Sequence, residues 1–316
     1  MKTLRLGLFM VVLLALSAGG IFAAGSGQAG KKTFAFCPPA MISPYYKSVI
    51  KGAQEAADRL GYNLITLAPD SESNYAAQVQ IVEDQITKNV DGIILCAINT
   101  DAIVSAVRKA NQANIPVVMF NTQNELTGGV QVACYVRYDQ REAGRKVADF
   151  VGKTFNGTAN VGILLGLPSD HTTERRGGFL EVAQAKYPNV KLVAEQPGDW
   201  EREKGMNAAA NMLTAHPEIT VFFGLSDEMA LGAYQAVSRA NVANKVAVCG
   251  FDGTPAAIAS VRAGQLLSTV YIGSEGTGTS CVEALDKIVK KQPVSKFINV
   301  DTEIVTKANA GKYPAE

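Results

Sequence analysis

The sequence predicts an α/β protein with two doubly wound parallel-sheet lobes joined by a hinge. Short apolar runs alternate with helix-length amphipathic segments, which is the pattern of βαβ crossovers and a parallel sheet. The alternation occurs twice, in two halves of similar make-up that meet near Tyr138 and Asp139. No Pro/Gly/Ser-rich linker marks this boundary. That absence favours several chain crossings between the lobes over a flexible tether.

The N-terminus has the features of a secretory signal peptide. Lys2 and Arg5 precede the apolar run 6–16, and small residues follow before a Gly/Ser-rich stretch. We expect a signal peptide at 1–23 and a flexible linker at 24–31. The apolar run is shorter than the roughly 20 residues that a membrane-spanning helix needs. The sequence therefore predicts export to the periplasm without stable membrane insertion.

Charge and cysteine content exclude several classes of function. Lys and Arg number 30 against 29 Asp and Glu, and the two signs are interspersed, so no basic patch indicates nucleic-acid or membrane binding. The five cysteines show no C-x-x-C spacing, and we expect buried thiols rather than a zinc site or disulfide scaffold. A disulfide between Cys37 and Cys96, on neighbouring strands, is the alternative. No metal or cofactor is expected.

The first half contains the helix on which two candidate site residues lie. Its strands are expected at 34–37, 63–67, 92–96, 115–120 and 130–136, and its helices at 44–60, 74–89 and 101–112. Ser43 and Pro44 start the first helix and Gly61 ends it. Tyr45 and Tyr46 thus lie on its first turn, at the carboxyl edge of the sheet where open α/β proteins bind ligands. The alternative is that both tyrosines only cover a helix end.

The second half repeats the pattern. Its strands are expected at 161–165, around Leu192, at 220–223, 246–249, 267–272 and 297–305, and its helices at 140–153, from about 170 through Phe179, at 201–213, from 227, from about Thr254 and at 279–291. The last strand, 297–305, has no obvious place in a completed second sheet. It therefore favours several chain crossings and a hinge rather than a tether.

Polar and aromatic residues follow the strands in both halves. Asp252 comes after the strand 246–249, and a carboxylate there would accept hydrogen bonds from vicinal hydroxyl groups. The alternative is that Asp252 caps the helix that begins near Thr254. The other candidates are Tyr45, Tyr46, Asn121, Tyr138, Arg175, Trp200 and Ser226. Flat aromatic walls and planar hydrogen-bonding groups together suit a sugar.

Common catalytic signatures are missing from the sequence. It contains no GxSxG, P-loop, HExxH or GxGxxG motif after a strand. The two histidines, His171 and His216, are expected in surface loops, and Asp227 heads a helix, where negative charge is favourable. We therefore expect a binding protein and no enzyme. An exported enzyme that uses Asp252 or Asp227 is the alternative.

From residue 34 to about 305 the chain resembles the pentose/hexose periplasmic solute-binding proteins of ABC importers, the ribose-binding-protein-like family. The matching segments are 43–46 (SPYY), 58–62 (DRLGY), 110–116 (ANQANIP), 175–179 (RRGGF), 213–217 (LTAHP), 226–232 (SDEMALG) and 250–255 (GFDGTP). The resemblance implies three hinge crossings, with lobes at 32–138 plus 274–301 and at 139–273 plus 302–312. It also implies a monomer that delivers ligand to an ABC permease, with a chemoreceptor as a further partner. Receptors for sugar-like autoinducers share the fold and are the alternative.

The resemblance also assigns site residues. Its aromatic pair corresponds to Tyr45 and Tyr46, its clamp arginine to Arg175, its third aromatic to Trp200 and its late aspartate to Asp252. The departures are Asn121 for a carboxylate, Thr122 for an arginine, Ser226 for an asparagine, and Cys96 and Ile272 for amides. We therefore expect a small sugar, polyol or related molecule with fewer hydroxyl groups than a pyranose, or with an alkyl group facing Ile272, in preference to ribose.

Overall fold

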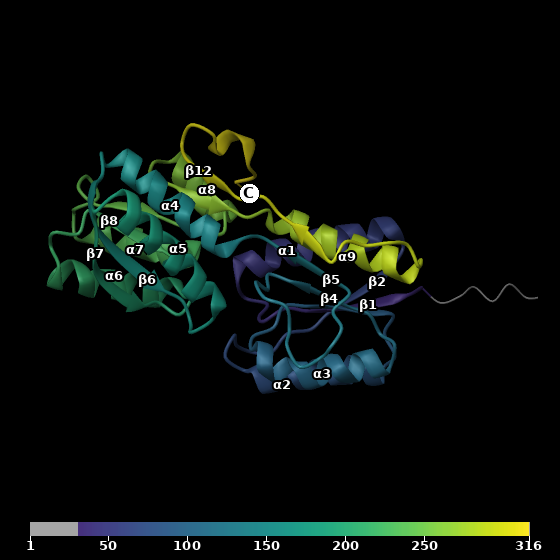
Figure 1. Cartoon of the computed structure of the whole chain (residues 1–316). Coiled ribbons are helices and arrows are strands. Elements are labelled where there is room, and N and C mark those ends of the chain that lie inside the picture. The colour runs from purple at the N-terminus through teal and green to yellow at the C-terminus, as the bar shows by residue number, and fades with distance from the viewer. Residues whose placement is uncertain (1–30, 316) are drawn as a thin grey trace, which may run out of the picture. The chain divides into compact units, whose positions relative to one another are not determined.

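The computed structural model describes residues 31–315. The expected signal peptide at 1–23 and most of the expected linker at 24–31 lie outside the described residues. Two separate parallel sheets, each with its own helices, make up the described chain (Figure 1). The predicted α/β fold class is confirmed.

The first sheet is entirely parallel and has the order β11-β5-β4-β3-β1-β2. Its strands are β1 (Thr33–Cys37), β2 (Asn63–Thr66), β3 (Gly92–Leu95), β4 (Val117–Phe120), β5 (Cys134–Arg137) and β11 (Phe297–Asn299), and its helices are α1 (Pro44–Leu60), α2 (Tyr75–Thr87), α3 (Thr100–Gln112) and α9 (Ser274–Val289). Helices α1 and α9 cover one face, and α2 and α3 cover the other (Figure 1). Side chains alternate between the two faces, since Ile94 packs with α1 whereas Ile93 and Leu95 pack with α3.

The second sheet has the order β7-β6-β8-β9 and is continued by the antiparallel pair β10-β12. Its strands are β6 (Thr158–Leu165), β7 (Asn189–Pro197), β8 (Val221–Gly224), β9 (Ala247–Cys249), β10 (Thr269–Tyr271) and β12 (Glu303–Val305), and its helices are α4 (Gln140–Thr154), α5 (Asp170–Lys186), α6 (Arg202–Ala215), α7 (Asp227–Arg239), α8 (Pro255–Arg262) and the short 3-10 helix η1 (Ala310–Lys312). Beyond the end of β9 the backbone pairs with β10, where the Asp252 amide donates to the Val270 carbonyl at 3.0 Å. This hydrogen bond therefore holds the backbone of Asp252 in place at the carboxyl end of the sheet.

The chain passes between the two sheets three times, from β5 to α4, from β10 to α9 and from β11 to β12. The predicted hinge of three crossings is confirmed. The single strand expected at 297–305 is wrong, because Asn299 pairs with Arg137 in the first sheet and Glu303 pairs with Tyr271 beside the second. In the sequence, the two short strands and the residues between them look like one continuous strand. Nothing in this segment marks the point at which the chain passes from one sheet to the other.

Helix α9 begins five residues before the expected start at residue 279. Its first turns contain small residues and glycines, which have weak intrinsic helix propensity. In the structure they allow close packing against α1. A Cβ on Gly278 would lie 1.9 Å from the Val49 carbonyl oxygen, and one on Gly52 would lie 2.0 Å from that of Glu275. Strand β5 likewise begins only at Cys134, later than the expected 130.

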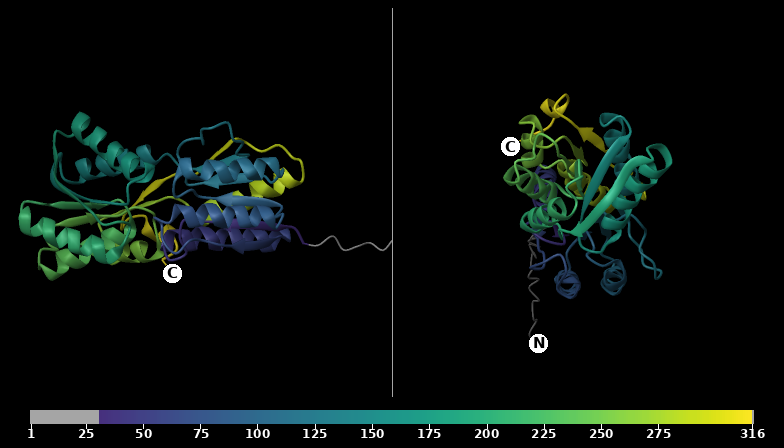
Figure 2. Two further views of the ribbon diagram at one scale, coloured as in Figure 1. Left: turned by 90° about the horizontal axis from the view of Figure 1, so that it is seen from below. Right: turned by 90° about the vertical axis from the view of Figure 1, so that its left-hand side faces the viewer.

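All five cysteines are buried and free. Cys37 packs on the α3 side of the first sheet and Cys96 on the α1 side, so the alternative of a Cys37–Cys96 disulfide is wrong. The C-terminal segment around η1 lies beside α8 (Figure 1 and Figure 2). Arg262 Nη2 on α8 donates to the Ala310 carbonyl at 3.0 Å. Among residues 31–315, no helix combines the length and apolar character required to cross a membrane.

Candidate ligand-binding cavity

A cavity of about 240 Å³ lies where the carboxyl ends of strands from both sheets meet. It is smaller than the roughly 300–1,000 Å³ typical of drug-sized ligand pockets. Seven of the nine predicted site residues line it: Tyr45, Tyr46, Asn121, Arg175, Trp200, Ser226 and Asp252. The strand-end positions noted in the sequence thus converge on one small space.

Tyr45 and Tyr46 enter the cavity from the first turn of α1. Pro44 occupies the first helical position after an extended Ser43, which fixes where the helix begins. The two rings meet edge to face, with centroids 5.0 Å apart. Burial raises the pKa of both phenols well above the usual value, so both hydroxyl groups stay protonated at neutral pH. The pair therefore offers aromatic surface together with neutral hydroxyl groups.

Arg175 on α5 is buried at the floor of the cavity. Its Nε donates to Gln140 Oε1 at 2.8 Å, and its Nη2 donates to the Tyr138 hydroxyl at 2.7 Å. Its Nη1 donates to the Leu225 carbonyl and, at 3.3 Å, to Asp252 Oδ1. A guanidinium carries five N–H groups, so one N–H on Nη2 remains for a ligand. Burial alone would lower the arginine pKa, but Tyr138 and Asp252 raise it above the usual value.

Asp252 lies opposite this guanidinium. Its backbone φ is 121°, a value that a residue other than glycine adopts only where the surrounding structure holds it. Burial raises the pKa of its carboxyl group to about 6, although the Arg175 charge lowers it. Helix α8 is capped instead by Thr254, whose hydroxyl accepts from the Ala257 amide at 3.4 Å. The alternative interpretation of Asp252 as the cap is therefore wrong.

Asp227 stabilises the loop that carries Asp252. It is one of the two carboxylates that the alternative of an exported enzyme would have used. Its buried carboxyl group accepts from the Thr254 amide at 2.7 Å, the Thr254 hydroxyl at 3.0 Å and the Thr269 hydroxyl at 2.6 Å. A Cβ on Gly250 would lie 2.4 Å from Asp227 Oδ1, so only glycine fits there. Asp227 positions the Asp252 loop and is absent from the cavity lining.

Trp200 forms a wall of the cavity from the turn between β7 and α6. Both Asp199 and Trp200 have positive φ values, 50° and 68°, which turn the chain sharply after Gly198. The indole covers Gly166, where a Cβ would lie 1.9 Å from Cζ2 of the ring. The Arg175 guanidinium lies 5.6 Å from the indole centroid. Gly166 therefore leaves the space that the ring occupies.

Asn121 and Ser226 line the cavity, but contacts within the protein engage both. Asn121 Oδ1 accepts from Gln140 Nε2 at 2.9 Å, and the Asn121 carbonyl contacts His171 Nε2 at 2.8 Å. The Ser226 hydroxyl caps α7 by accepting from the Met229 amide at 3.4 Å. Each residue thus has part of its hydrogen-bonding capacity left for a ligand.

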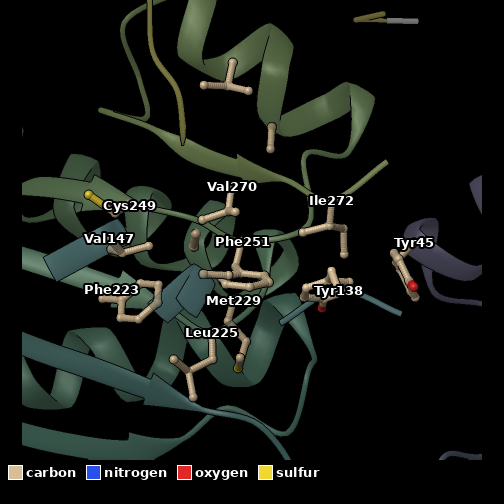
Figure 3. Close-up of a cluster of buried hydrophobic side chains, with 14 of the residues drawn as sticks. Tyr45, Tyr138, Val147, Phe223, Leu225, Met229, Cys249, Phe251, Val270 and Ile272 are labelled. Atoms are coloured by element: carbon tan, nitrogen blue, oxygen red, sulfur yellow. The ribbon is translucent and has the colours of Figure 1, made fainter. Parts of the chain in front are cut away.

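The structure does not bring Tyr138 and Ile272 to the cavity surface. Tyr138 lies behind Arg175, where its hydroxyl donates to Gln140 Oε1 at 3.1 Å. Ile272 is fully buried and lies beside Tyr138 in the apolar cluster around Phe251 (Figure 3). The cavity lining gives no support to direct ligand contact for these two residues.

Glu72, Gln140 and His171 contribute to the site, and the sequence did not predict this role for any of them. Glu72 lines the cavity from the connection between β2 and α2, which also follows a strand, so the rule that found Asn121 could have found it. Gln140 joins Tyr138, Arg175 and Asn121 beneath the cavity, and nothing in the sequence around it indicates this role.

His171 was expected in a surface loop, and that expectation is wrong because it lines the cavity. Burial, with the charge of Arg175, lowers its pKa to about 4, so it is neutral at physiological pH. Within the described part of the chain, no cluster of three or more His, Cys, Asp or Glu residues could hold a metal ion.

Comparisons with known proteins agree with this geometry. The family model described as "Periplasmic binding protein domain" matches residues 34–293. The chain is 36% identical over 294 residues to the ribose import binding protein of Escherichia coli, a match that covers 92% of this chain and 97% of the relative. It is 30% identical over 307 residues to a D-apiose import binding protein of Paraburkholderia graminis, covering 96% of each.

Solved structures show the same similarity. An ABC transporter periplasmic solute-binding protein from Actinobacillus succinogenes with bound D-allose has a TM-score of 0.85 and 32% identity, covering 90% of this chain and all of the other. A solute-binding protein from Bacillus halodurans with bound myo-inositol has a TM-score of 0.82 and 26% identity, covering 92% of this chain and 99% of the other. The chain belongs to the periplasmic binding protein family, in the group whose members resemble the ribose-binding protein.

Proposed function

We propose that the protein captures a small sugar or polyol in the cavity and delivers it to an ABC importer. The observation that carries this proposal is the meeting of three aromatic walls, Tyr45, Tyr46 and Trp200, with the Arg175–Asp252 pair in one small space. Aromatic faces cover the C–H surface of a sugar ring, and the charged pair can bind hydroxyl groups in fixed directions. The relatives named above bind ribose, apiose, allose or myo-inositol.

The protein is a binding protein and not an enzyme, as expected for its family. Incubation with each sugar followed by product analysis tests this point independently of the family. Every sugar should be recovered unchanged. Loss of a bound sugar with appearance of a product would contradict the assignment.

The ligand should carry fewer hydroxyl groups than a pyranose, or an alkyl or deoxy position. The hydroxyl of Thr122 donates to the Phe120 carbonyl at 3.1 Å, and Asn121 and Ser226 are partly engaged, so these positions offer few free partners. A buried hydroxyl group without a partner costs about 1–3 kcal/mol. Ordered waters could replace the missing groups at little cost and restore ordinary pentose binding, which makes the question an experimental one.

A thermal-shift panel tests this specificity. It contains D-ribose, D-apiose, D-allose, myo-inositol, deoxysugars and short polyols. A deoxysugar or short polyol should raise the melting temperature most. If ribose gave the largest rise, the specificity proposal would fail while the binding function survived.

The family and the sheet connections support lobes at 32–138 plus 274–301 and at 139–273 plus 302–312, which close around the ligand. Delivery from the periplasm requires that the N-terminal segment direct export and be removed, which N-terminal sequencing of the exported protein tests. We expect a monomer whose closed form is recognised by an ABC permease. A chemoreceptor is expected as a second binding partner of the closed form. Size-exclusion chromatography with light scattering tests the monomeric state.

A further inference from the structure

We propose that Glu72 determines specificity by accepting hydrogen bonds from ligand hydroxyl groups in its ionised form, so that it replaces the carboxylate missing at Asn121. This inference rests on the proposed function of sugar or polyol binding. It names a residue that neither the strand-end analysis nor the family resemblance selected.

Glu72 is the lining carboxylate that is available to a ligand. Asp252 faces Arg175, and Glu228 forms a two-bond ion pair with Arg202 at 3.0 and 2.7 Å. Glu72, in contrast, makes no hydrogen bond or ion pair with any residue in the range 31–315. A half-buried carboxylate of this kind gains a charge-assisted hydrogen bond from a donor that enters with the ligand.

The uncharged amide of Asn121 is a weaker acceptor than a carboxylate. Its Oδ1 already accepts from Gln140 Nε2, which is itself held by Arg175 and Tyr138. Among the lining residues that precede residue 138, Glu72 is the one carboxylate, and the other polar groups are neutral hydroxyl groups and amides. The charged acceptor for ligand hydroxyl groups on this side of the cavity is therefore Glu72.

The groups that face Glu72 set its protonation. They are Tyr46 on α1, Cys96 after β3, Arg175 on α5 and Asp252 after β9. Burial raises the pKa of Glu72 to about 7, Asp252 adds to this rise, and Arg175 opposes it. Burial also raises the pKa of Tyr46 and Cys96, so these two groups are neutral near pH 7.

A ligand that donates hydrogen bonds to the carboxylate lowers this pKa and releases a proton when it binds. Release follows because only the ionised form is stabilised. With a free pKa of about 7, about half a proton should leave per ligand at pH 7. By the same linkage, affinity should be roughly tenfold lower at pH 6 than at pH 8.

Isothermal titration calorimetry at pH 7 in two buffers of different ionisation enthalpy measures the released proton. The probe is whichever of D-ribose, D-apiose, D-allose or myo-inositol binds most tightly. Glu72→Gln keeps the shape and removes the titration. It should release no proton through this site, lose most of the pH dependence, and bind about tenfold or more weakly at pH 8 because a charged acceptor is gone.

Asp70→Asn is the matched control, because Asp70 is an exposed carboxylate of the same connection and does not line the cavity. It should retain the proton release and the pH profile. Asp252, whose pKa burial raises to about 6, is present in both the wild type and Glu72→Gln, so the difference between the two proteins reports on Glu72.

Equal proton release in the wild type and Glu72→Gln would overturn the assignment while sugar binding stood, and so would proton uptake on binding by the wild type. A wild-type protein that bound none of the four probes would overturn both this inference and the proposed function.

Discussion

Replacement of Arg175 by alanine should remove measurable sugar binding. The guanidinium has one free N–H for the ligand, and a hydrogen bond to a charged group contributes about 1.5–3 kcal/mol. The same change leaves Asp252 buried without its cation, and truncation of one member of such a pair costs about 2–5 kcal/mol. We therefore expect at least a thirtyfold loss of affinity, since about 1.4 kcal/mol corresponds to a factor of ten.

The assay is titration calorimetry with the most stabilising sugar of the panel, and circular dichroism shows whether the variant is folded. Arg176→Ala is the matched control, because Arg176 is the next residue on α5 and pairs with Glu195 at the surface. Such exposed pairs contribute at most about 1 kcal/mol to stability, and affinity should be unchanged. A folded Arg175→Ala variant that binds as tightly as the wild type would refute the reasoning.

Three further predictions follow from the cavity. Gly166→Ala forces the indole of Trp200 to move, so it should weaken binding about tenfold and abolish the ligand-induced change in fluorescence of this single tryptophan. Gly276→Ala is the control and should change neither, because its Cβ would meet nothing within 4 Å. Saturating sugar should reduce the radius of gyration in small-angle scattering by closing the lobes about a hinge near residues 138, 273 and 301, and an unchanged radius would count against closure. Because the folded-state pKa of Glu72 lies above its unfolded value, its contribution to apo-protein stability is present at low pH and is lost as pH rises through about 7. The melting temperature of Glu72→Gln minus that of the wild type should therefore increase between pH 5 and pH 8, and a constant difference would contradict this.

Much of the fold could be predicted because its signals are local. The alternation of apolar runs and helices defines both sheets, and the Ser43-Pro44 start of α1 is visible without neighbours. The misplaced boundaries depend on tertiary contacts. The glycines at the start of α9 resemble a loop until α1 packs against them, and the residues between β11 and β12 change sheet without any sequence marker.

Some residues of the candidate site could likewise be predicted from local signals in the sequence, and others could not. Tyr45, Trp200 and Asp252 follow strands or start helices, so their convergence was predictable from the position of ligand sites in open sheets. Gln140 and His171 also lie at helix starts that follow strands, on α4 and α5, but that position alone does not show their contacts. Gln140 acts through contacts to residues distant in sequence, and nothing in the sequence shows that the half-buried His171 faces the cavity.

Native mass spectrometry of the protein purified from its own source tests the central claim most directly. It should show one bound molecule with the mass of a small sugar or polyol, displaced by the panel sugar that raises the melting temperature most and absent from Arg175→Ala. A bound molecule of another class that no panel sugar displaces would contradict the proposed function.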